Sequence, residues 1–188
     1  MLIFLVIHSG GGIDGTARQT ATEIFSGLYE KYLPKVFSYV SYRVEEKEIV
    51  EDITSAIFEK AVAKYSSYDE KKAGFGTWIF TIARNAIIDY YRSRHKEQEY
   101  RKEAKIQIMV LSTSIEEEVA RTEDIKKLKM CLKKLGEKEQ EIITLKFSSE
   151  MNNREIAGVT GLSESNVGTI LCRAIKKLRD EFTGWQHE

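Results

Sequence analysis

Cysteine, proline and long apolar runs are scarce in this chain of 188 residues, and each scarcity excludes a class of protein. Two cysteines without a ligand pattern exclude a disulfide framework and a zinc site, and they fit a reducing cytoplasm. The apolar segment Met1–Ile7 is far shorter than a membrane span and lacks the basic residues of a secretory signal. A single proline among long periodic segments predicts an all-α fold.

An excess of charge is also lacking, because 29 basic and 29 acidic side chains cancel. The total therefore gives no support for a nucleic-acid partner. The distribution is uneven, however: 45–52 and 116–118 are acidic, whereas 92–105 and 173–179 are mainly basic. A neutral chain with separate patches can face DNA on one side and a protein on another.

The stretch Phe75–Lys96 is the most informative part of the sequence. Its apolar residues recur at the spacing of one helix face: Ile79, Ile82, Ala83, Ala86, Ile87 and Tyr90. Thr77 is the expected N-cap, because its hydroxyl can accept a hydrogen bond from a backbone N–H. Trp78 falls off the stripe, and the stretch ends in cations. Two interpretations stay open: an amphipathic helix with Trp78 in the core, or a platform where an unpaired DNA base stacks beside phosphate-binding cations.

Apolar periodicity predicts further helices on both sides of this stretch. One covers 24–40, and Pro34 inside it should cause a kink or a short break. Another runs from about Glu46 to Tyr65, and a third covers 137–147 with Phe147 on its buried side. The expected organisation is two small helical domains joined by a flexible linker. Its divisions are a disordered tail at 1–20, a domain at 21–98, a linker at 99–113, a domain at 114–183 and a tail at 184–188.

The C-terminal quarter predicts a helix-turn-helix, with an ordinary helical hairpin as the alternative. Asn152 and Glu155 have the spacing of a capping box, Gly161 can adopt a positive φ in the turn, and Ser163 can cap the longer helix. The N-terminal side chains of such a helix can reach base edges in the major groove, and cations farther along can hold phosphates. The base-edge candidates are Ser165, Asn166 and Thr169, and the phosphate candidates are Arg173, Lys176 and Lys177.

Three motifs, in this order and spacing, resemble the extracytoplasmic-function (ECF) sigma factors of the sigma-70 family. They are EDITSAIFEKA at 51–61, FGTWIFTIARNAIIDYYR at 75–92, and LKKLGEKEQEIITLKF followed by NNREIAGVTGLSESNVGTILCRAIKKLR within 132–179. The resemblance implies that the first domain is a region 2 helical bundle and the second a region 4 helix-turn-helix. It also implies core RNA polymerase and promoter DNA as partners.

The resemblance assigns a surface to each partner. Region 2 would bind the β′ clamp helices of the polymerase through Asp52, Ser55 and Glu59, although Ser55 stands where the family usually has glutamine. It would also melt the −10 element, with a base flipped into the loop at 66–75. Its DNA side would consist of Phe75, Trp78, Asn85, Asp89, Arg92 and Arg94. Region 4 would read the −35 element with its second helix and touch the β flap.

Further expectations follow from the same resemblance. The chain would be a cytoplasmic monomer, held by an anti-sigma factor, with no cofactor, metal, catalytic residue or small-molecule substrate. A stand-alone dimeric regulator would explain only the C-terminal helices. A nucleic-acid hydrolase would need Asp52, Asp69 and Asp89 to converge on a metal, and their surroundings lack ligand spacing. Cys172, on the polar side of the last helix, is either a filler or an oxidisable thiol near DNA.

Overall fold

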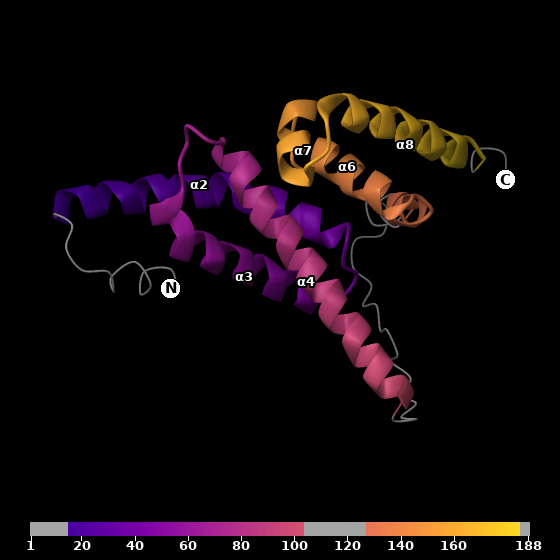
Figure 1. The fold of residues 1–188 in the computed structure, drawn as a ribbon, viewed down its shortest axis with the longest axis horizontal. Coiled ribbons are helices and arrows are strands. Elements are labelled where there is room, and N and C mark those ends of the chain that lie inside the picture. Colours follow the sequence, from indigo (N-terminus) through magenta and orange to yellow (C-terminus); the bar gives the residue numbers. More distant parts are fainter. Residues whose placement is uncertain (1–14, 104–126, 185–188) are drawn as a thin grey trace.

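The computed structural model describes residues 15–103 and 127–184, and within these ranges every regular element is a helix (Figure 1). The expected all-α fold is confirmed. The elements are α2 (Gly15–Ser41), α3 (Lys47–Lys64), the 3-10 turn η2 (Tyr65–Ser67), α4 (Phe75–Glu103), a helical segment at 127–133, α6 (Glu137–Phe147), α7 (Asn153–Thr160) and α8 (Glu164–Gly184). None of the described helices is both long enough and apolar enough to cross a bilayer.

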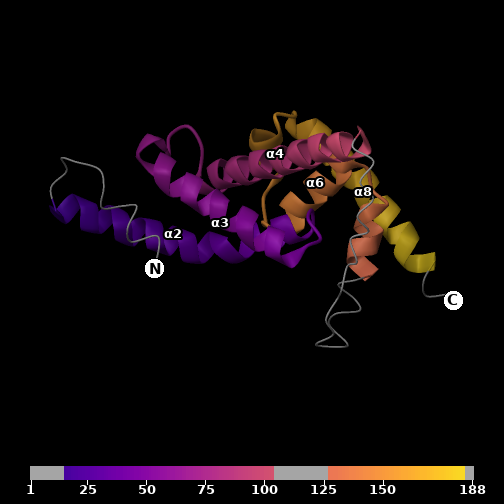
Figure 2. The same cartoon turned by 90° about the horizontal axis from the view of Figure 1, so that it is seen from below.

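Helices α2, α3 and α4 form an N-terminal bundle, which the second view shows from below (Figure 2). The apolar stripes face one another because hydrophobic residues recur every three or four positions. The fully buried side chains of this bundle include Val36, Tyr39, Val40, Ile57, Ala61, Ile79, Ala83 and Ile87. The bundle leaves the polar faces of α3 and α4 at the surface.

The structure bears on two local expectations for the bundle: the short break expected at Pro34 is absent, and the predicted N-cap at Thr77 is wrong. Helix α2 continues across Pro34 without a break, and packing holds it on both sides of the proline, since Phe25 and Val36 are buried. Helix α4 begins at Phe75, and the Trp78 amide donates to the Gly74 carbonyl at 3.1 Å, so Thr77 lies inside the first turn. Helix α2 starts at Gly15, inside the stretch expected as a tail at 1–20. Residues 1–14 lie outside the described part of the chain.

The segment at 127–133 and helices α6, α7 and α8 form a C-terminal module with a helix-turn-helix. Asn152 caps α7 by accepting from the Glu155 amide at 2.9 Å, and the Glu155 carboxylate accepts from the Asn152 amide at 2.8 Å. Gly161 has a φ of 76° in the turn, and the Ser163 hydroxyl accepts from the Asn166 amide at 3.2 Å. The predicted caps and turn are therefore confirmed. Phe147, expected to be buried, is 63% exposed.

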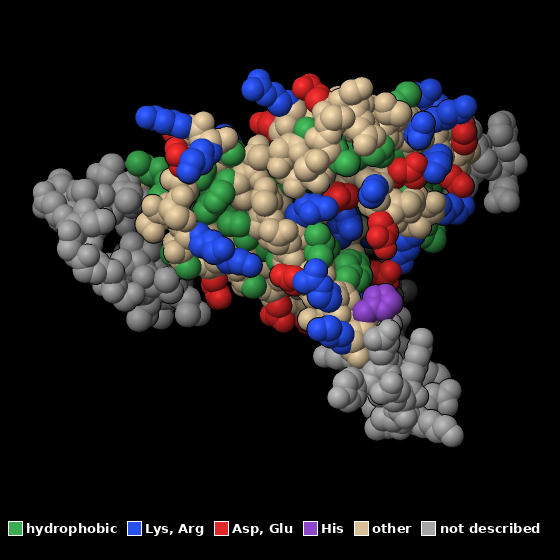
Figure 3. All heavy atoms as spheres, in the orientation of Figure 1, with side chains coloured by type: hydrophobic (Ala, Val, Ile, Leu, Met, Phe, Trp, Pro, Cys, Tyr) green, Lys and Arg blue, Asp and Glu red, His purple; other side chains and the backbone are tan. Residues whose placement is uncertain are grey.

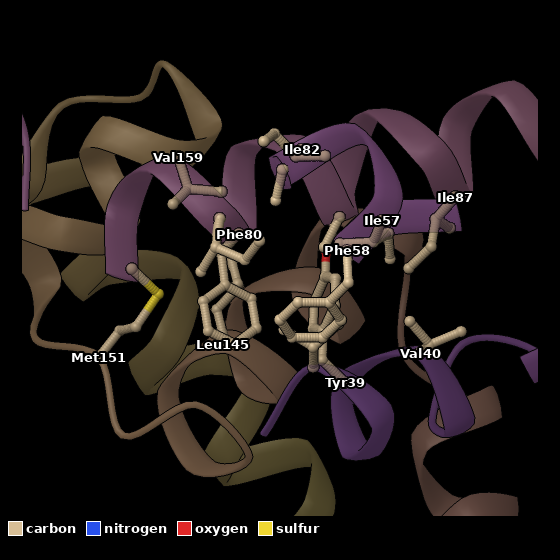
Figure 4. Close-up of a cluster of buried hydrophobic side chains, with 14 of the residues drawn as sticks. Tyr39, Val40, Ile57, Phe58, Phe80, Ile82, Ile87, Leu145, Met151 and Val159 are labelled. Carbon is tan, nitrogen blue, oxygen red and sulfur yellow. The ribbon is translucent and has the colours of Figure 1, made fainter. Parts of the chain in front are cut away.

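The two modules pack against each other, which the sequence did not predict. Helix α7 contacts α4, and Leu145, Met151 and Val159 share one hydrophobic core with the N-terminal bundle. Phe80 lies in the same cluster (Figure 4). Phe80 lies outside the predicted apolar stripe of α4 but is 1% exposed. Helix α4 covers 99–103 of the expected linker, and 104–113 lie outside the described residues.

Candidate nucleic-acid interface

An aromatic cluster lies where the loop after α3 leads into α4. Phe75 is 7% exposed, and its ring contacts Tyr32, Tyr68 and Trp78 at centroid distances of 5.2, 5.7 and 5.4 Å. Such a ring adds both buried area and favourable edge contacts to the core. Phe75 therefore lies beneath the expected DNA side, and its predicted place on that surface does not agree with its burial.

Trp78 sits at the edge of this cluster. Its ring lies 5.0 Å from Tyr68 and 5.4 Å from Phe75, and the side chain is only partly buried. One side of the ring thus supports the core while the residue still reaches the surface, and base stacking on Trp78 stays a prediction. A supported ring is held in place before any base stacks on it.

Four of the candidate residues on α4 share one face. Trp78, Asn85, Asp89 and Arg92 are separated by seven, four and three residues, which places them in one row along a helix. Asn85, Asp89 and Arg92 are exposed, and the Arg92 guanidinium contacts the Asp89 carboxylate at 3.2 Å. Arg94 is exposed too, but it contacts the Glu46 carboxylate at 3.1 Å and the Tyr90 hydroxyl at 2.8 Å. Both arginines would exchange these exposed contacts for phosphates at little cost.

The candidate protein-binding residues lie on α3. Asp52, Ser55 and Glu59 are exposed at spacings of three and four residues, so they share one face. The opposite side of α3 buries Ile57, Phe58 and Ala61 in the bundle core. The structure therefore brings these three polar side chains together at the surface.

The candidate DNA-reading residues of α8 are all exposed. Ser165, Asn166 and Thr169 occupy the first turns, and the Thr169 hydroxyl donates to the Ser165 carbonyl at 3.0 Å. Arg173 and Lys176 are exposed farther along the helix. Figure 3 shows basic side chains, with a few acidic ones, along the edge formed by α8. The Lys177 ammonium differs from its neighbours, because it contacts both oxygens of Glu139 at 2.8 and 2.9 Å.

Glu139 connects α6 to this basic helix. The hydrogen bond from Lys177, followed by the one from the Gly136 amide, holds the pKa of the Glu139 carboxyl below its usual range. A carboxyl whose pKa is lower in the folded state stabilises the fold above its unfolded pKa. That stability is lost as pH falls through the folded pKa.

We therefore expect the Glu139→Gln variant to melt at a lower temperature than the wild type at neutral pH, and the gap to shrink once pH falls well below about 4. Circular dichroism melts at both pH values measure this. Glu137→Gln, at an exposed position of the same helical turn, is the matched control and should change little at either pH. An equal gap at both pH values would contradict the linkage.

Arg84 belongs to the same motif as the α4 candidates, but it forms an ion pair with the other module. Its Nε contacts the Glu141 carboxylate at 2.8 Å, and the two side chains are only 28% and 11% exposed. From the sequence, Arg84 could be seen only as a charged residue that lies off the apolar stripe of its helix. Its partner lies 57 residues away in the other module, so local pattern could not identify the pair.

Comparisons with known proteins agree with this arrangement. The profile of Sigma-70 region 2 matches residues 28–97, and that of Sigma-70, region 4 matches residues 125–178. The ECF RNA polymerase sigma factor BldN of Streptomyces coelicolor is 29% identical over 162 residues, which are 86% of this chain and 61% of BldN. The ECF RNA polymerase sigma factor SigM of Bacillus subtilis is 29% identical over 153 residues, which are 81% of this chain and 91% of SigM.

Solved structures share the fold. The sigma factor RpoE in complex with the anti-sigma factor NepR from Bartonella quintana aligns with a TM-score of 0.73 at 21% identity, covering 86% of this chain and 98% of RpoE. CnrH in complex with the cytosolic domain of CnrY aligns with a TM-score of 0.67 at 19% identity, covering 97% of this chain and 96% of CnrH. With two region profiles matched in order across well over half of the sequence, the chain belongs to the sigma-70 family, in its extracytoplasmic-function group.

Proposed function

We propose that this chain is a sigma factor that directs core RNA polymerase to particular promoters and helps to open them. The observation that carries the proposal is the row on α4 of the partly buried Trp78 and the exposed Asn85, Asp89 and Arg92, in one chain with a capped helix-turn-helix. The first can hold unpaired DNA and the second can read duplex DNA. We assign 21–98 to region 2 and 114–183 to region 4, in line with the matched profiles.

Each surface then receives a partner. The α3 face of Asp52, Ser55 and Glu59 binds the β′ clamp helices, and region 4 also touches the β flap. The α4 row and Arg94 face the −10 element, with Phe75 supporting Trp78 from below. On α8, base edges are read by Ser165, Asn166 and Thr169, and phosphates are held by Arg173, Lys176 and Lys177.

The free energies of strand separation and of base stacking explain why such a protein needs the polymerase. Separating DNA costs about 1.4 kcal/mol per base-pair step in stacking. Stacking a base on an aromatic side chain returns about 1–3 kcal/mol. One or two captured bases cannot hold a bubble open, so the polymerase supplies the remainder. The chain itself is then a binding subunit, as sigma factors are, and not an enzyme.

Regulation and location follow from the family. Two solved structures of similar fold contain an anti-sigma factor, NepR, or the cytosolic domain of CnrY. We propose that a protein of this kind holds the present chain as an otherwise monomeric factor in the cytoplasm.

The test is transcription in vitro with core RNA polymerase and a pool of templates that carry randomised upstream DNA. Sequencing the transcripts should reveal one pair of sequence elements that is enriched only when the chain is present. The core polymerase alone is the control. Transcripts without any enriched element would refute the proposal, and binding of the free chain to palindromic duplexes as a dimer would favour a stand-alone regulator.

The hydrolase alternative has little structural support. Asp89 contacts Arg92, and Asp69 accepts from the Lys71 amide at 3.0 Å and lies 3.7 Å from the Lys72 ammonium. Among the described residues, no group of three histidine, cysteine or acidic side chains is placed to hold a metal ion. Asp69 and Asp89 therefore serve separate local contacts.

Lys177 is already paired with Glu139, and we therefore expect Arg173 and Lys177 to contribute differently to DNA binding. Arg173→Ala should weaken holoenzyme binding across many promoter sequences and flatten the plot of log affinity against log salt by about one unit. Lys177→Ala should flatten it less, because its ammonium already contacts Glu139. Fluorescence anisotropy over a salt series measures both slopes. A loss for Arg173→Ala that is confined to one base position would show that Arg173 reads a base.

A further inference from the structure

A cavity of about 580 Å³ lies beside the turn that follows α2, where Tyr91 of α4 and the segment at 127–133 complete its walls. Sites for small organic molecules usually have volumes of about 300–1,000 Å³, so the cavity is large enough for more than a single ion. None of the residues that line it is among those assigned above to polymerase or to DNA. The function proposed above therefore leaves this cavity without a role.

The turn at 41–45 forms one wall of the cavity and is held firmly in place. The Tyr91 hydroxyl donates a hydrogen bond to the Arg43 carbonyl. The amides of Arg43 and Val44 both donate to the Val40 carbonyl, at 2.9 and 2.8 Å, and the Val44 side chain is buried in the bundle core. The wall is thus formed before any ligand arrives, which lowers the entropic cost of binding.

Positive charge dominates the lining of the cavity. Arg43, Lys129 and Lys133 line it, and among its described lining residues Glu45 is the only acidic one. The Lys133 ammonium contacts the Glu45 carboxylate at 2.5 Å, so this carboxylate is already engaged. The remaining two cations, Arg43 and Lys129, give the cavity an excess of positive charge that favours an anion.

These two cations lack sufficient partners within the described part of the chain. The Nη1 atom of Arg43 is buried and has no hydrogen-bond partner there. The Lys129 ammonium forms no direct ion pair with a described carboxylate. Burial lowers the pKa of Lys129, the Glu45 carboxylate opposes this effect, and the Lys133 ammonium adds to it. A buried donor and a desolvated charge are both costly when unpaired, so an anion that entered the cavity would stabilise both groups.

The rest of the lining suits an organic group. Tyr91 and Met130 are large apolar side chains that remain 39% and 49% exposed, and both line this cavity together with Tyr42. Aromatic rings and a methionine offer apolar area that adapts to the shape of a ligand. A bare inorganic anion would leave this area uncovered.

We infer that the cavity binds a small organic phosphate ester, whose phosphate is held by Arg43 and Lys129 and whose organic part lies against Tyr42 and Tyr91. A phosphate monoester carries a charge of about −1.5 to −2 at neutral pH, which matches the two cations that lack partners. The planar guanidinium can bind two phosphate oxygens, and the ammonium adds a point charge. Arg43 belongs to the N-terminal bundle and Lys129 to the C-terminal module, so a bound phosphate contacts both.

A titration of the full-length, ¹⁵N-labelled chain with AMP, ribose 5-phosphate, adenosine and inorganic phosphate tests the inference. Both phosphate esters should shift the amide resonances of 41–45 and 129–133 and raise the melting temperature of the chain. Adenosine, which lacks the phosphate, and inorganic phosphate, which lacks the organic part, should each bind at least about tenfold more weakly. The loss of one charge-assisted contact accounts for a factor of this size.

Substitutions at Lys129 test the assigned cation. Lys129→Ala should weaken the binding of AMP by about tenfold or more, whereas Lys129→Arg, which keeps the charge, should retain most of the affinity. Alanine is a good helix former and removes a costly charge, so the fold is not at risk. Lys127→Ala is the matched control, because Lys127 is exposed on the same segment and does not line the cavity.

Each contrary outcome overturns the inference. Neither phosphate ester may fail to bind, and their shifts must not lie on the basic face of α8 instead of the cavity. Adenosine that binds as tightly as AMP would remove the role of the phosphate, and inorganic phosphate that binds equally well would remove that of the organic part. Affinity for AMP that is the same in Lys129→Ala as in Lys127→Ala would remove Lys129. In all these cases the proposed sigma function stands, because it does not involve the cavity.

Discussion

Replacing Phe80 with alanine should lower the free energy of unfolding by about 3–5 kcal/mol, the usual range for a fully buried phenylalanine. The ring contacts Tyr39 edge-to-face, with the centroids 5.5 Å apart, and shares its core with Leu145 and Val159. The truncation therefore removes contacts in both modules and leaves a cavity between them. Equilibrium unfolding in urea measures the change as a lower midpoint.

Phe147 offers a matched control for this prediction, because the same substitution is made at the exposed end of α6. Phe147→Ala should change the free energy of unfolding by no more than about 0.5 kcal/mol. If the two variants were equally destabilised, Phe80 could not occupy the shared core. A Phe80→Leu variant, which keeps most of the apolar volume, should lie between them.

Trp78→Ala should reduce the formation of open promoter complexes about 5-fold to 150-fold, which corresponds to the loss of one stacked base. Binding to core polymerase should change much less, because the proposed β′ contact lies on α3. Permanganate reactivity of thymines in the −10 region measures strand opening, and competition for core polymerase measures binding. Opening that is unchanged in the variant would remove Trp78 from the DNA surface.

Trp78 also supports its aromatic neighbours, so the packing effect must be separated from the stacking effect. Its ring lies against Tyr68 and Phe75. Trp78→Leu keeps apolar volume in that position but offers no aromatic face. It should therefore lose strand opening nearly as much as Trp78→Ala while it keeps more of the thermal stability. Equal losses of stability and opening in both variants would point to a purely structural role.

Local interactions explain what could be predicted from the sequence. The capping box of Asn152 and Glu155, the turn at Gly161 and the cap at Ser163 each involve residues within three positions of one another. The shared face of Trp78 and Arg92 likewise follows from helical spacing alone. Such features are decided by short-range geometry, which a single sequence contains.

Long-range packing explains what could not be predicted. Phe80 lies off the predicted apolar stripe of α4, and it is buried in a core to which Tyr39 of the bundle and Leu145 and Val159 of the C-terminal module all contribute. Arg84 likewise pairs with Glu141 of the other module. Phe147 shows the converse, since its periodic position suggested burial but no described element covers it. Phe75, expected on the DNA side, is buried among the rings of Tyr32, Tyr68 and Trp78.

The rate of amide hydrogen exchange in helix α7 should depend on the contact between α7 and α4. A helix of eight residues is too short to persist alone, so its backbone hydrogens are protected by its cap and by the surfaces on either side of it. In the free chain, deuterium should enter these amides slowly. A variant that loosens the contact with α4, such as Phe80→Ala, should weaken one of those surfaces, and labelling of 153–160 should accelerate relative to the amides of α3.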